Sequence, residues 1–201
     1  MIRLLLADDQ ALVRSALATM LDLEPDFQVV ATVGRGDEVV AAALEAGPDV
    51  ALVDIEMPGL DGIAATAALG AARPGCRVLI VTTFGRAGYL RRAMEAGALG
   101  FVVKDAPPEE LAAAIRKVAR GERVVDAQLA AASLASGPSP LTRREQDVLS
   151  VAREGATVGD IARRLHLSEG TVRNYLSTAI TKLGARNRIE AARTAETNGW
   201  L

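Results

Sequence analysis

Residues 2–9, Ile2-Arg3-Leu4-Leu5-Leu6-Ala7-Asp8-Asp9, decide the fold, because a short apolar run stops there at two adjacent carboxylates. Comparable apolar runs recur at four later places in the chain, namely residues 27–33, 50–53, 77–82 and 99–103. These runs are short, rich in β-branched residues and continuous rather than alternating in polarity. This pattern is typical of strands that are buried on both faces of a parallel sheet.

Helical patterns fill the intervals between these strands. They cover about residues 11–22, 36–46, 60–72, 87–96 and 107–120. In the last interval Leu111, Ile115 and Val118 recur at helical spacing and form one apolar stripe. Five strand–helix alternations predict an α/β domain over residues 1–120, built on a five-stranded, parallel, doubly wound sheet of the flavodoxin-like kind.

The pattern changes after Gly121. Residues 121–140 form a predicted linker, in which an alanine-rich stretch at 126–135 has helical character. The breakers Ser136-Gly137-Pro138-Ser139-Pro140 follow that stretch and separate it from the rest of the chain.

Beyond the linker we find helical patterns and no strand-like run. They cover about residues 142–154, 157–165, 169–183 and 187–198. Thr142 and Glu145 have the spacing of a capping box at the start of the first pattern, and Ser168 can cap the third. Residues 141–201 are therefore predicted to form an all-α domain of four helices.

The composition excludes several classes of protein. Half of the 201 residues are hydrophobic (50%), so a disordered or fibrous chain is excluded. The single cysteine, Cys76, excludes a disulfide framework and a multi-cysteine zinc site, and the single histidine, His166, argues against a multi-histidine site. The first residues lack the apolar run of a signal peptide or a membrane span, so we expect a soluble, cytoplasmic protein without membrane insertion.

The net charge of −2 hides an asymmetry between the two predicted domains. Residues 1–137 carry a net charge of −5, whereas residues 138–201 carry 10 basic and 7 acidic residues, a net charge of +3. An acidic front half joined to a basic tail suggests a regulatory or catalytic part coupled to a nucleic-acid contact, although so small a surplus also arises by ordinary variation.

Chemically distinctive residues follow the predicted strands of the first domain. Asp8 and Asp9 end the first strand, Asp54 the third, Thr82 the fourth and Lys104 the fifth. Because the carboxyl ends of parallel strands meet at one edge of an open sheet, we expect these side chains to converge. Clustered carboxylates repel one another, and Mg²⁺, which prefers oxygen ligands, relieves that repulsion. The sequence therefore predicts a magnesium site.

Asp54 is the best candidate for a nucleophile in this set. It ends the central strand, and a carboxylate can attack phosphorus to form an aspartyl-phosphate. The Lys104 amine and the Thr82 hydroxyl suit the phosphoryl oxygens as charge and hydrogen-bond donor. Any one of these aspartates taken alone is equally explained as a turn or capping residue.

These residues resemble the receiver domain of two-component response regulators over about residues 1–120. The resemblance rests on Leu6-Ala7-Asp8-Asp9, Val53-Asp54-Ile55-Glu56-Met57-Pro58-Gly59-Leu60-Asp61-Gly62, Val81-Thr82-Thr83 and Val102-Val103-Lys104-Asp105. It implies that Asp54 accepts a phosphoryl group from a histidine kinase, and that Asp8, Asp9, Asp54 and the backbone carbonyl of Glu56 hold Mg²⁺.

The same resemblance implies a switch formed by Thr82 and Phe101, with Lys104 as the phosphate contact. Two positions depart from the common pattern: Asp105 follows the lysine where many receivers have proline, and Phe101 stands in place of the commoner tyrosine. The missing hydroxyl implies a switch that works through ring packing. A receiver catalyses its own phosphotransfer and dephosphorylation, but the chain is not expected to be an enzyme with turnover.

Residues 157–183 have the pattern of a helix-turn-helix. A helix with an apolar edge is followed by a turn at 166–168 and by a second helix whose apolar residues repeat at helical spacing. The opposite face of this second helix carries Gly170 and five residues whose side chains can bond base edges, namely Arg173, Asn174, Ser177, Thr178 and Thr181. Candidates for phosphate contacts are Arg163, Arg164, Lys182, Arg186 and Arg188. Periodicity alone fits a plain helical bundle with solvated arginines at least as well.

Residues 141–198 resemble the LuxR-type output domain. The resemblance rests on Leu141-Thr142-Arg143-Arg144-Glu145, Val148-Leu149, Gly155, Asp160-Ile161-Ala162, Leu165, Leu167-Ser168, Thr171-Val172-Arg173-Asn174-Tyr175, Lys182-Leu183 and Asn187-Arg188-Ile189-Glu190-Ala191. Tyr175 and Ser177 depart from the common pattern, which bears on the DNA sequence preferred. The two halves together resemble the NarL/FixJ class, with the desaturase-regulator type as the nearest in the run 170–177.

The resemblance implies a transcription regulator whose partners are a cognate histidine kinase, DNA and, on phosphorylation, a second copy of the chain. Two other readings stay open. The first is a Mg²⁺-dependent aspartyl-phosphate phosphatase or phosphotransferase, although Gln10 and Ala11 stand where such enzymes carry a second carboxylate. The second is a DNA-binding regulator that does not depend on phosphorylation.

Overall fold

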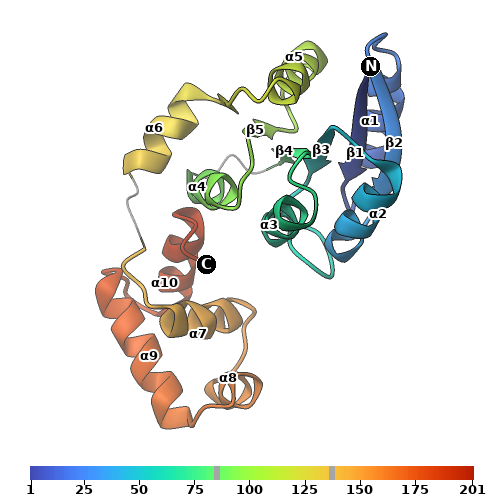
Figure 1. Cartoon of the computed structure of the whole chain (residues 1–201). Helices are drawn as coiled ribbons and strands as arrows, with labels where there is room; N and C mark the ends of the chain where they lie inside the picture. Colours follow the sequence, from blue (N-terminus) through green and yellow to red (C-terminus); the bar gives the residue numbers. More distant parts are fainter. Residues whose placement is uncertain (84–86, 136–138) are drawn as a thin grey trace. The chain divides into compact units, whose positions relative to one another are not determined.

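The computed structural model describes residues 1–83, 87–135 and 139–201. The chain forms two compact units, the first built mainly from residues before 131 and the second mainly from residues 131–201 (Figure 1). Residues 136–138 of the predicted linker lie outside the described residues. Within the described part of the chain, no helix has both the length and the apolarity needed to cross a membrane.

A parallel sheet forms the centre of the first unit. The strands are β1 (Ile2–Ala7), β2 (Phe27–Val33), β3 (Val50–Val53), β4 (Arg77–Thr82), β5 (Gly100–Val103) and β6 (Val124–Val125). Their order is β2-β1-β3-β4-β5-β6, and each pair of neighbours is parallel. Because this order is that of flavodoxin-like doubly wound folds, the predicted fold class is confirmed.

The predicted count of five strands is wrong by one. β6 extends the sheet beyond β5, with Gly100 opposite Val124 and Phe101 opposite Val125. A strand of two residues is too short to show any periodicity, so the sequence left this segment in the linker. It forms because the chain, after the last helix of the unit, returns to the open edge of β5, where the Val124 amide donates to the Leu99 carbonyl over 3.0 Å.

Each strand is followed by a helix at the place that the sequence predicts. They are α1 (Ala11–Asp22), α2 (Val39–Ala46), α3 (Gly62–Ala72), α4 (Ala87–Glu95), α5 (Pro108–Ala119) and α6 (Ala127–Ala135). The segment predicted as one helix at 36–46 begins with a 3-10 turn, η1 (Gly36–Glu38). The Gly36 amide donates to the Pro58 carbonyl over 3.1 Å, so this turn is held by the loop that follows β3.

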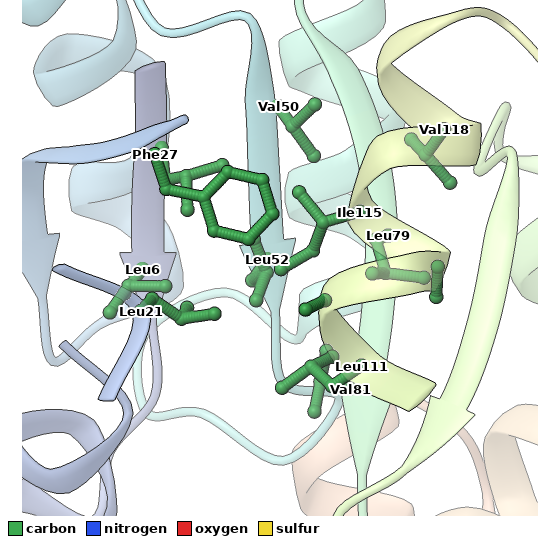
Figure 2. Packing of buried hydrophobic residues seen from close by; sticks show 13 residues of the cluster. Leu6, Leu21, Phe27, Val50, Leu52, Leu79, Val81, Leu111, Ile115 and Val118 are labelled. Carbon is green, nitrogen blue, oxygen red and sulfur yellow. The ribbon is translucent and has the colours of Figure 1, made fainter. Parts of the chain in front are cut away.

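One core of the first unit lies between one face of the sheet and the helices α1 and α5. Leu6 and Leu52 point from the strands toward Leu21 of α1 and Ile115 of α5, and the Phe27 ring fills the space between them (Figure 2). The predicted stripe on α5 is confirmed, since the side chains of Leu111, Ile115 and Val118 are all buried. This packing fixes the sheet whose carboxyl edge carries the candidate site.

The second unit contains the four helices predicted for it. They are α7 (Arg143–Arg153), α8 (Val158–Leu165), α9 (Glu169–Lys182) and α10 (Arg188–Thr197). They surround a separate core that includes Leu149 of α7, Ile161 of α8, Val172 of α9 and Ala191 of α10.

Side-chain caps set the starts of these helices. The capping box of Thr142 and Glu145 is present, because the Thr142 amide donates to Glu145 Oε2 over 2.7 Å and the Glu145 amide donates to Thr142 Oγ1. Ser168 caps α9 by accepting from the Thr171 amide over 3.1 Å. His166 ends α8 in the left-handed region (φ 54°), which turns the chain sharply into α9. The predicted caps and turn are confirmed.

Candidate functional site

Three carboxylates meet at the carboxyl edge of the sheet. Asp8 and Asp9 follow β1 directly, and Asp54 follows β3, the neighbouring strand. One carboxylate oxygen of each lies within 4.8 Å of the others. Asp8 and Asp54 are buried, whereas Asp9 is exposed and opens the cluster to solvent. The convergence predicted from the strand ends is therefore present.

Lys104, which follows β5, places its amine between the two buried carboxylates. The Lys104 Nζ atom lies 2.6 Å from Asp8 Oδ2 and 2.8 Å from Asp54 Oδ2. The other oxygen of each carboxylate accepts a backbone hydrogen bond, from Gln10 to Asp8 and from Ile55 to Asp54. Both aspartates are thus held in one orientation from two sides.

Burial and charge shift the protonation equilibria of this pair. Burial raises the pKa of Asp54 above its usual range, and the nearby Asp8 carboxylate adds to the rise, although Lys104 works against it. Burial disfavours the charged form of Lys104, but hydrogen bonds to Asp54 and Asp8 outweigh burial and raise the pKa of the amine. The site therefore holds a lysine ammonium that is stabilised by carboxylates.

The donor set fits Mg²⁺. The cluster offers oxygen ligands only, which Mg²⁺ prefers, and it combines two fixed carboxylates with one exposed carboxylate. Three carboxylates and one ammonium leave an excess of negative charge at this edge. A divalent cation would relieve that excess. The main chain of Glu56, whose carbonyl is the fourth predicted ligand, lies two residues beyond Asp54 on the same loop.

Thr82 and Phe101 lie at the neighbouring strand ends. Thr82 ends β4 and is buried, and the Lys104 amide donates to the Thr82 carbonyl over 2.8 Å. The Phe101 ring is among the largest fully enclosed side chains of the chain. The two residues implied as a switch are therefore both packed inside the first unit, one beside the lysine and one on the adjacent strand β5.

Gly62 supports the site in a way that the sequence did not show. It begins α3 directly behind Asp54, and its amide donates to the Ile55 carbonyl over 2.8 Å. A Cβ atom at this position would lie 1.8 Å from the Asp54 carbonyl oxygen, so only glycine fits. Gly62 belongs to the motif quoted for the resemblance, but its spacing carried no sign of this contact.

Arg14 is a second supporting residue that the sequence did not show. Its side chain, on the first turns of α1, donates to the backbone carbonyl of Asp8. Arg14 therefore holds the loop that presents Asp8 and Asp9. No pattern in the sequence distinguishes this arginine from an ordinary solvated residue of α1.

The second unit exposes the residues that were predicted to face DNA. Val172, Leu176 and Ala179 of α9 are buried in the core of the unit. The opposite face of α9 is exposed over its whole length, at Gly170, Arg173, Asn174, Ser177, Thr178 and Thr181. The periodicity thus assigned the inner and outer faces of α9 correctly.

The basic residues predicted to contact DNA are held by groups of their own unit. Arg164 donates to Glu154 over 2.6 Å, Arg186 to Glu190 over 3.0 Å, and Arg188 to the Ala156 carbonyl over 3.2 Å. Arg163 is paired with Asp160 and Arg173 with Glu169 in the same way.

Lys182 differs from these arginines because its partner is buried. The Lys182 Nζ atom lies 2.9 and 2.8 Å from the two carboxylate oxygens of Glu145, a residue that is 4% exposed. This pair joins the end of α9 to the start of α7. Burial tends to raise the pKa of Glu145, but the hydrogen bonds from Lys182 and Thr142 prevail and lower it.

Comparisons with known proteins agree with this arrangement. The family "Response regulator receiver domain" matches residues 4–116, and the family "Bacterial regulatory proteins, luxR family" matches residues 139–195. The transcriptional regulatory protein DesR of Bacillus subtilis is 42% identical, with 100% of both chains covered. The response regulator RamR of Streptomyces coelicolor is 44% identical, with 100% of this chain and 98% of RamR covered.

Solved structures show the same combination of folds. The crystal structure of the response regulator ChrA, from a heme-sensing two-component system, is 36% identical and has a TM-score of 0.59, with 100% of this chain and 98% of ChrA covered. The RcsB–DNA complex, at 22% identity and a TM-score of 0.67, supports the fold. The chain belongs to the response regulators that join a receiver domain to a DNA-binding domain of the LuxR family.

Proposed function

We propose that Asp54 accepts a phosphoryl group from a cognate histidine kinase, and that this modification controls dimerisation and sequence-specific DNA binding. The observation that carries the proposal is the Lys104 amine, held between buried Asp8 and Asp54 beside the exposed carboxylate of Asp9. In this arrangement one aspartate is oriented for attack and a cation is ready for the incoming phosphoryl oxygens. The proposal assigns this activity to the cytoplasm, where the chain would meet both DNA and the kinase.

The chemistry follows from the groups at the edge of the sheet. An Asp54 carboxylate oxygen attacks phosphorus while the bond from phosphorus to the donor histidine nitrogen breaks, and that nitrogen keeps the electron pair and takes a proton from water, so the histidine leaves neutral. Lys104 is already 2.8 Å from Asp54 and moves its hydrogen bonds onto a phosphoryl oxygen. Asp8, Asp9, Asp54 and the Glu56 carbonyl would hold Mg²⁺, which supplies charge neutralisation at the phosphoryl group.

The phosphoryl group would act on the switch pair. Thr82 lies beside Lys104 at the end of β4, so its hydroxyl can bond a phosphoryl oxygen once Asp54 is modified. Movement of Thr82 changes the packing around Phe101, which lacks a hydroxyl and responds through its ring. Two discrete packings biased by one new charged group are sufficient for a switch.

The second unit would bind DNA through α9. Arg173 and Asn174 can make paired hydrogen bonds to guanine and adenine, with Ser177, Thr178 and Thr181 on the same exposed face. Phosphate anchors are assigned to Arg163, Arg164, Arg186 and Arg188, and Lys182 is assigned to holding α9 on Glu145. We place the receiver domain at 1–120, the linker at 121–140 and the DNA-binding domain at 141–201.

Phosphotransfer from a small phosphodonor tests the acceptor. In the presence of Mg²⁺, intact-mass measurement should show one added phosphoryl group on the natural protein and none on Asp54→Asn. Glu45→Gln, which changes an exposed carboxylate of α2, serves as the matched control and should be modified normally. Undiminished modification of Asp54→Asn would refute the assignment, and steady turnover of a free phosphomonoester would favour the phosphatase reading.

A further inference from the structure

All seven acidic residues of the chain after residue 137 form ion pairs with basic residues of the same segment. The pairs are Glu145 with Lys182, Asp147 with Arg144, Glu154 with Arg164, Asp160 with Arg163, Glu169 with Arg173, Glu190 with Arg186, and Glu196 with Arg153. Five of these pairs involve a basic residue that was predicted to contact DNA. Most of the basic residues assigned to DNA are therefore already paired with a carboxylate in the absence of DNA, with Arg188 outside these ion pairs.

The pair of Glu169 and Arg173 lies on α9, the helix proposed to bind DNA. Arg173 donates to Glu169 Oε2 over 2.7 Å, within the first turns of α9, and the two side chains are 63% and 54% exposed. The other carboxylate oxygen of Glu169, Oε1, lies beside Gly159 in the first turn of α8. A Cβ atom added to Gly159 would be 3.4 Å from this oxygen. The Glu169 carboxylate therefore lies near the first turns of both α8 and α9, where it pairs with Arg173.

We infer that Glu169 is a specificity-determining residue, which competes with DNA for the Arg173 guanidinium and prevents it from binding phosphates at random. This inference rests on the proposed binding of DNA by α9. An arginine leaves its carboxylate readily when guanine offers two acceptors in the matching geometry. A phosphate group of random DNA does not offer this paired geometry, and the neighbouring Glu169 carboxylate repels the phosphate. Arg173 therefore stays on Glu169 when the DNA is random. The mechanism is discrimination by a built-in unfavourable contact.

Neutralising Glu169 should therefore weaken discrimination. In Glu169→Gln, Arg173 is free to bind any neighbouring phosphate, so affinity for random DNA should rise by about fivefold, with a salt dependence steeper by about one phosphate contact. Affinity for the preferred sequence should rise by no more than about twofold, because an exposed ion pair is weak. The ratio of the two affinities should fall.

The matched control is Glu196→Gln. It removes the same charge from the same unit, but Glu196 pairs with Arg153, which lies outside the predicted DNA face. Two DNA duplexes serve as probes. One is selected from a random library by the natural full-length protein, and the other is a scrambled duplex of equal length. Binding of each is titrated over a range of salt concentrations. Thermal unfolding of each variant establishes that it is folded, which we expect because both glutamines replace glutamates at similar size.

The outcomes separate the inference from the proposed function. A rise in affinity for the scrambled duplex in Glu169→Gln, absent in Glu196→Gln, supports the inference. Equal changes of affinity in Glu169→Gln and Glu196→Gln would overturn the inference, and so would equal gains in affinity for both duplexes. Binding of DNA by α9 would still stand in that case if Arg173→Ala loses affinity for the selected duplex. If Arg173→Ala binds that duplex as the natural protein does, the proposed role of α9 fails instead.

Discussion

Lys104 lies 2.8 Å from Asp54, so the amine expected to hold the phosphoryl group neutralises its acceptor before any phosphoryl group is present. The same amine is 2.6 Å from Asp8. Two of the three carboxylates that would hold Mg²⁺ are therefore shared with a lysine. Binding of the metal and of the phosphoryl group both require Lys104 to exchange partners, and this exchange can be measured.

Lys104→Met should bind Mg²⁺ more tightly while accepting phosphoryl groups more slowly. Removal of a competing cation from two carboxylates strengthens metal binding by about tenfold, a change of roughly 1.4 kcal/mol. Isothermal titration with Mg²⁺ measures this affinity, and mass measurement over time gives the rate of modification. Lys117→Met, on the exposed face of α5, should change neither quantity. Weaker Mg²⁺ binding in Lys104→Met would contradict the competition.

Gly62→Ala should destabilise the first unit, because its Cβ atom would lie 1.8 Å from the Asp54 carbonyl oxygen. Overpacking of this kind costs about 3 kcal/mol in the free energy of unfolding. Gly70→Ala changes the same helix at a place with no atom within 4 Å, and should stabilise it by about 0.5–1 kcal/mol. Circular dichroism during urea denaturation compares the two variants, and equal stabilities would show that α3 adjusts freely.

Lys182→Met should destabilise the second unit by about 2 kcal/mol, because it leaves the buried Glu145 carboxylate without its cation. The chain has one tryptophan, Trp200, which packs on the core of this unit, so its fluorescence reports the unfolding. Arg186→Met, at a side chain that is 86% exposed, is the control and should change stability by less than about 0.5 kcal/mol.

The same two variants distinguish positioning from phosphate contact. The salt dependence of DNA binding should be unchanged in Lys182→Met and weaker by about one contact in Arg186→Met. A weaker dependence in Lys182→Met would assign its amine to DNA after all. The double variant Glu145→Leu, Lys182→Met should lose less stability than Lys182→Met alone, since no charge is left buried.

Glu145 should also make the second unit sensitive to acid. Its pKa is lowered in the folded state, so its contribution to stability is present above the pKa of the unfolded chain, about 4.3, and is lost as the pH falls through the lower folded value. Trp200 fluorescence during acid titration should show a weaker pH dependence in Glu145→Gln. In Lys182→Met the sign should reverse, because burial without the cation raises the pKa of Glu145 in the folded state, so protonation of Glu145 should recover stability as the pH falls. The same acid loss in Lys182→Met as in the natural protein would contradict this assignment.

The sequence predicted the frame of both units well. The apolar runs that mark β1, β2, β3 and β4 have the limits that the structure shows. Strands inside a sheet, such as β3, are buried on both faces and need continuous hydrophobic residues, whereas β2 is an edge strand in which only Phe27 is buried. β6 was missed because its two residues form a strand only through pairing with β5. The start of α2 was missed because it depends on a contact between Gly36 and Pro58, 22 positions apart.

The candidate site was predicted as a set of residues and not as a set of contacts. Strand ends bring Asp8, Asp54 and Lys104 to one edge, which topology alone dictates. The partner of Lys182 was not predictable, because Glu145 is 37 positions away and its burial depends on how α7 packs on α9. The sequence of α9 carries no sign that this lysine bonds a buried carboxylate, and its predicted contact with DNA stays a prediction.

The decisive measurement compares DNA affinity and molecular size with and without a phosphoryl mimic, beryllium trifluoride, bound with Mg²⁺ at Asp54. For the natural protein, the mimic should raise affinity for the selected duplex by about tenfold or more and shift sedimentation from monomer to dimer. Asp54→Asn should show neither change. Equal affinity and equal size of the natural protein with and without the mimic would contradict control by phosphorylation and leave a DNA-binding protein that is always active.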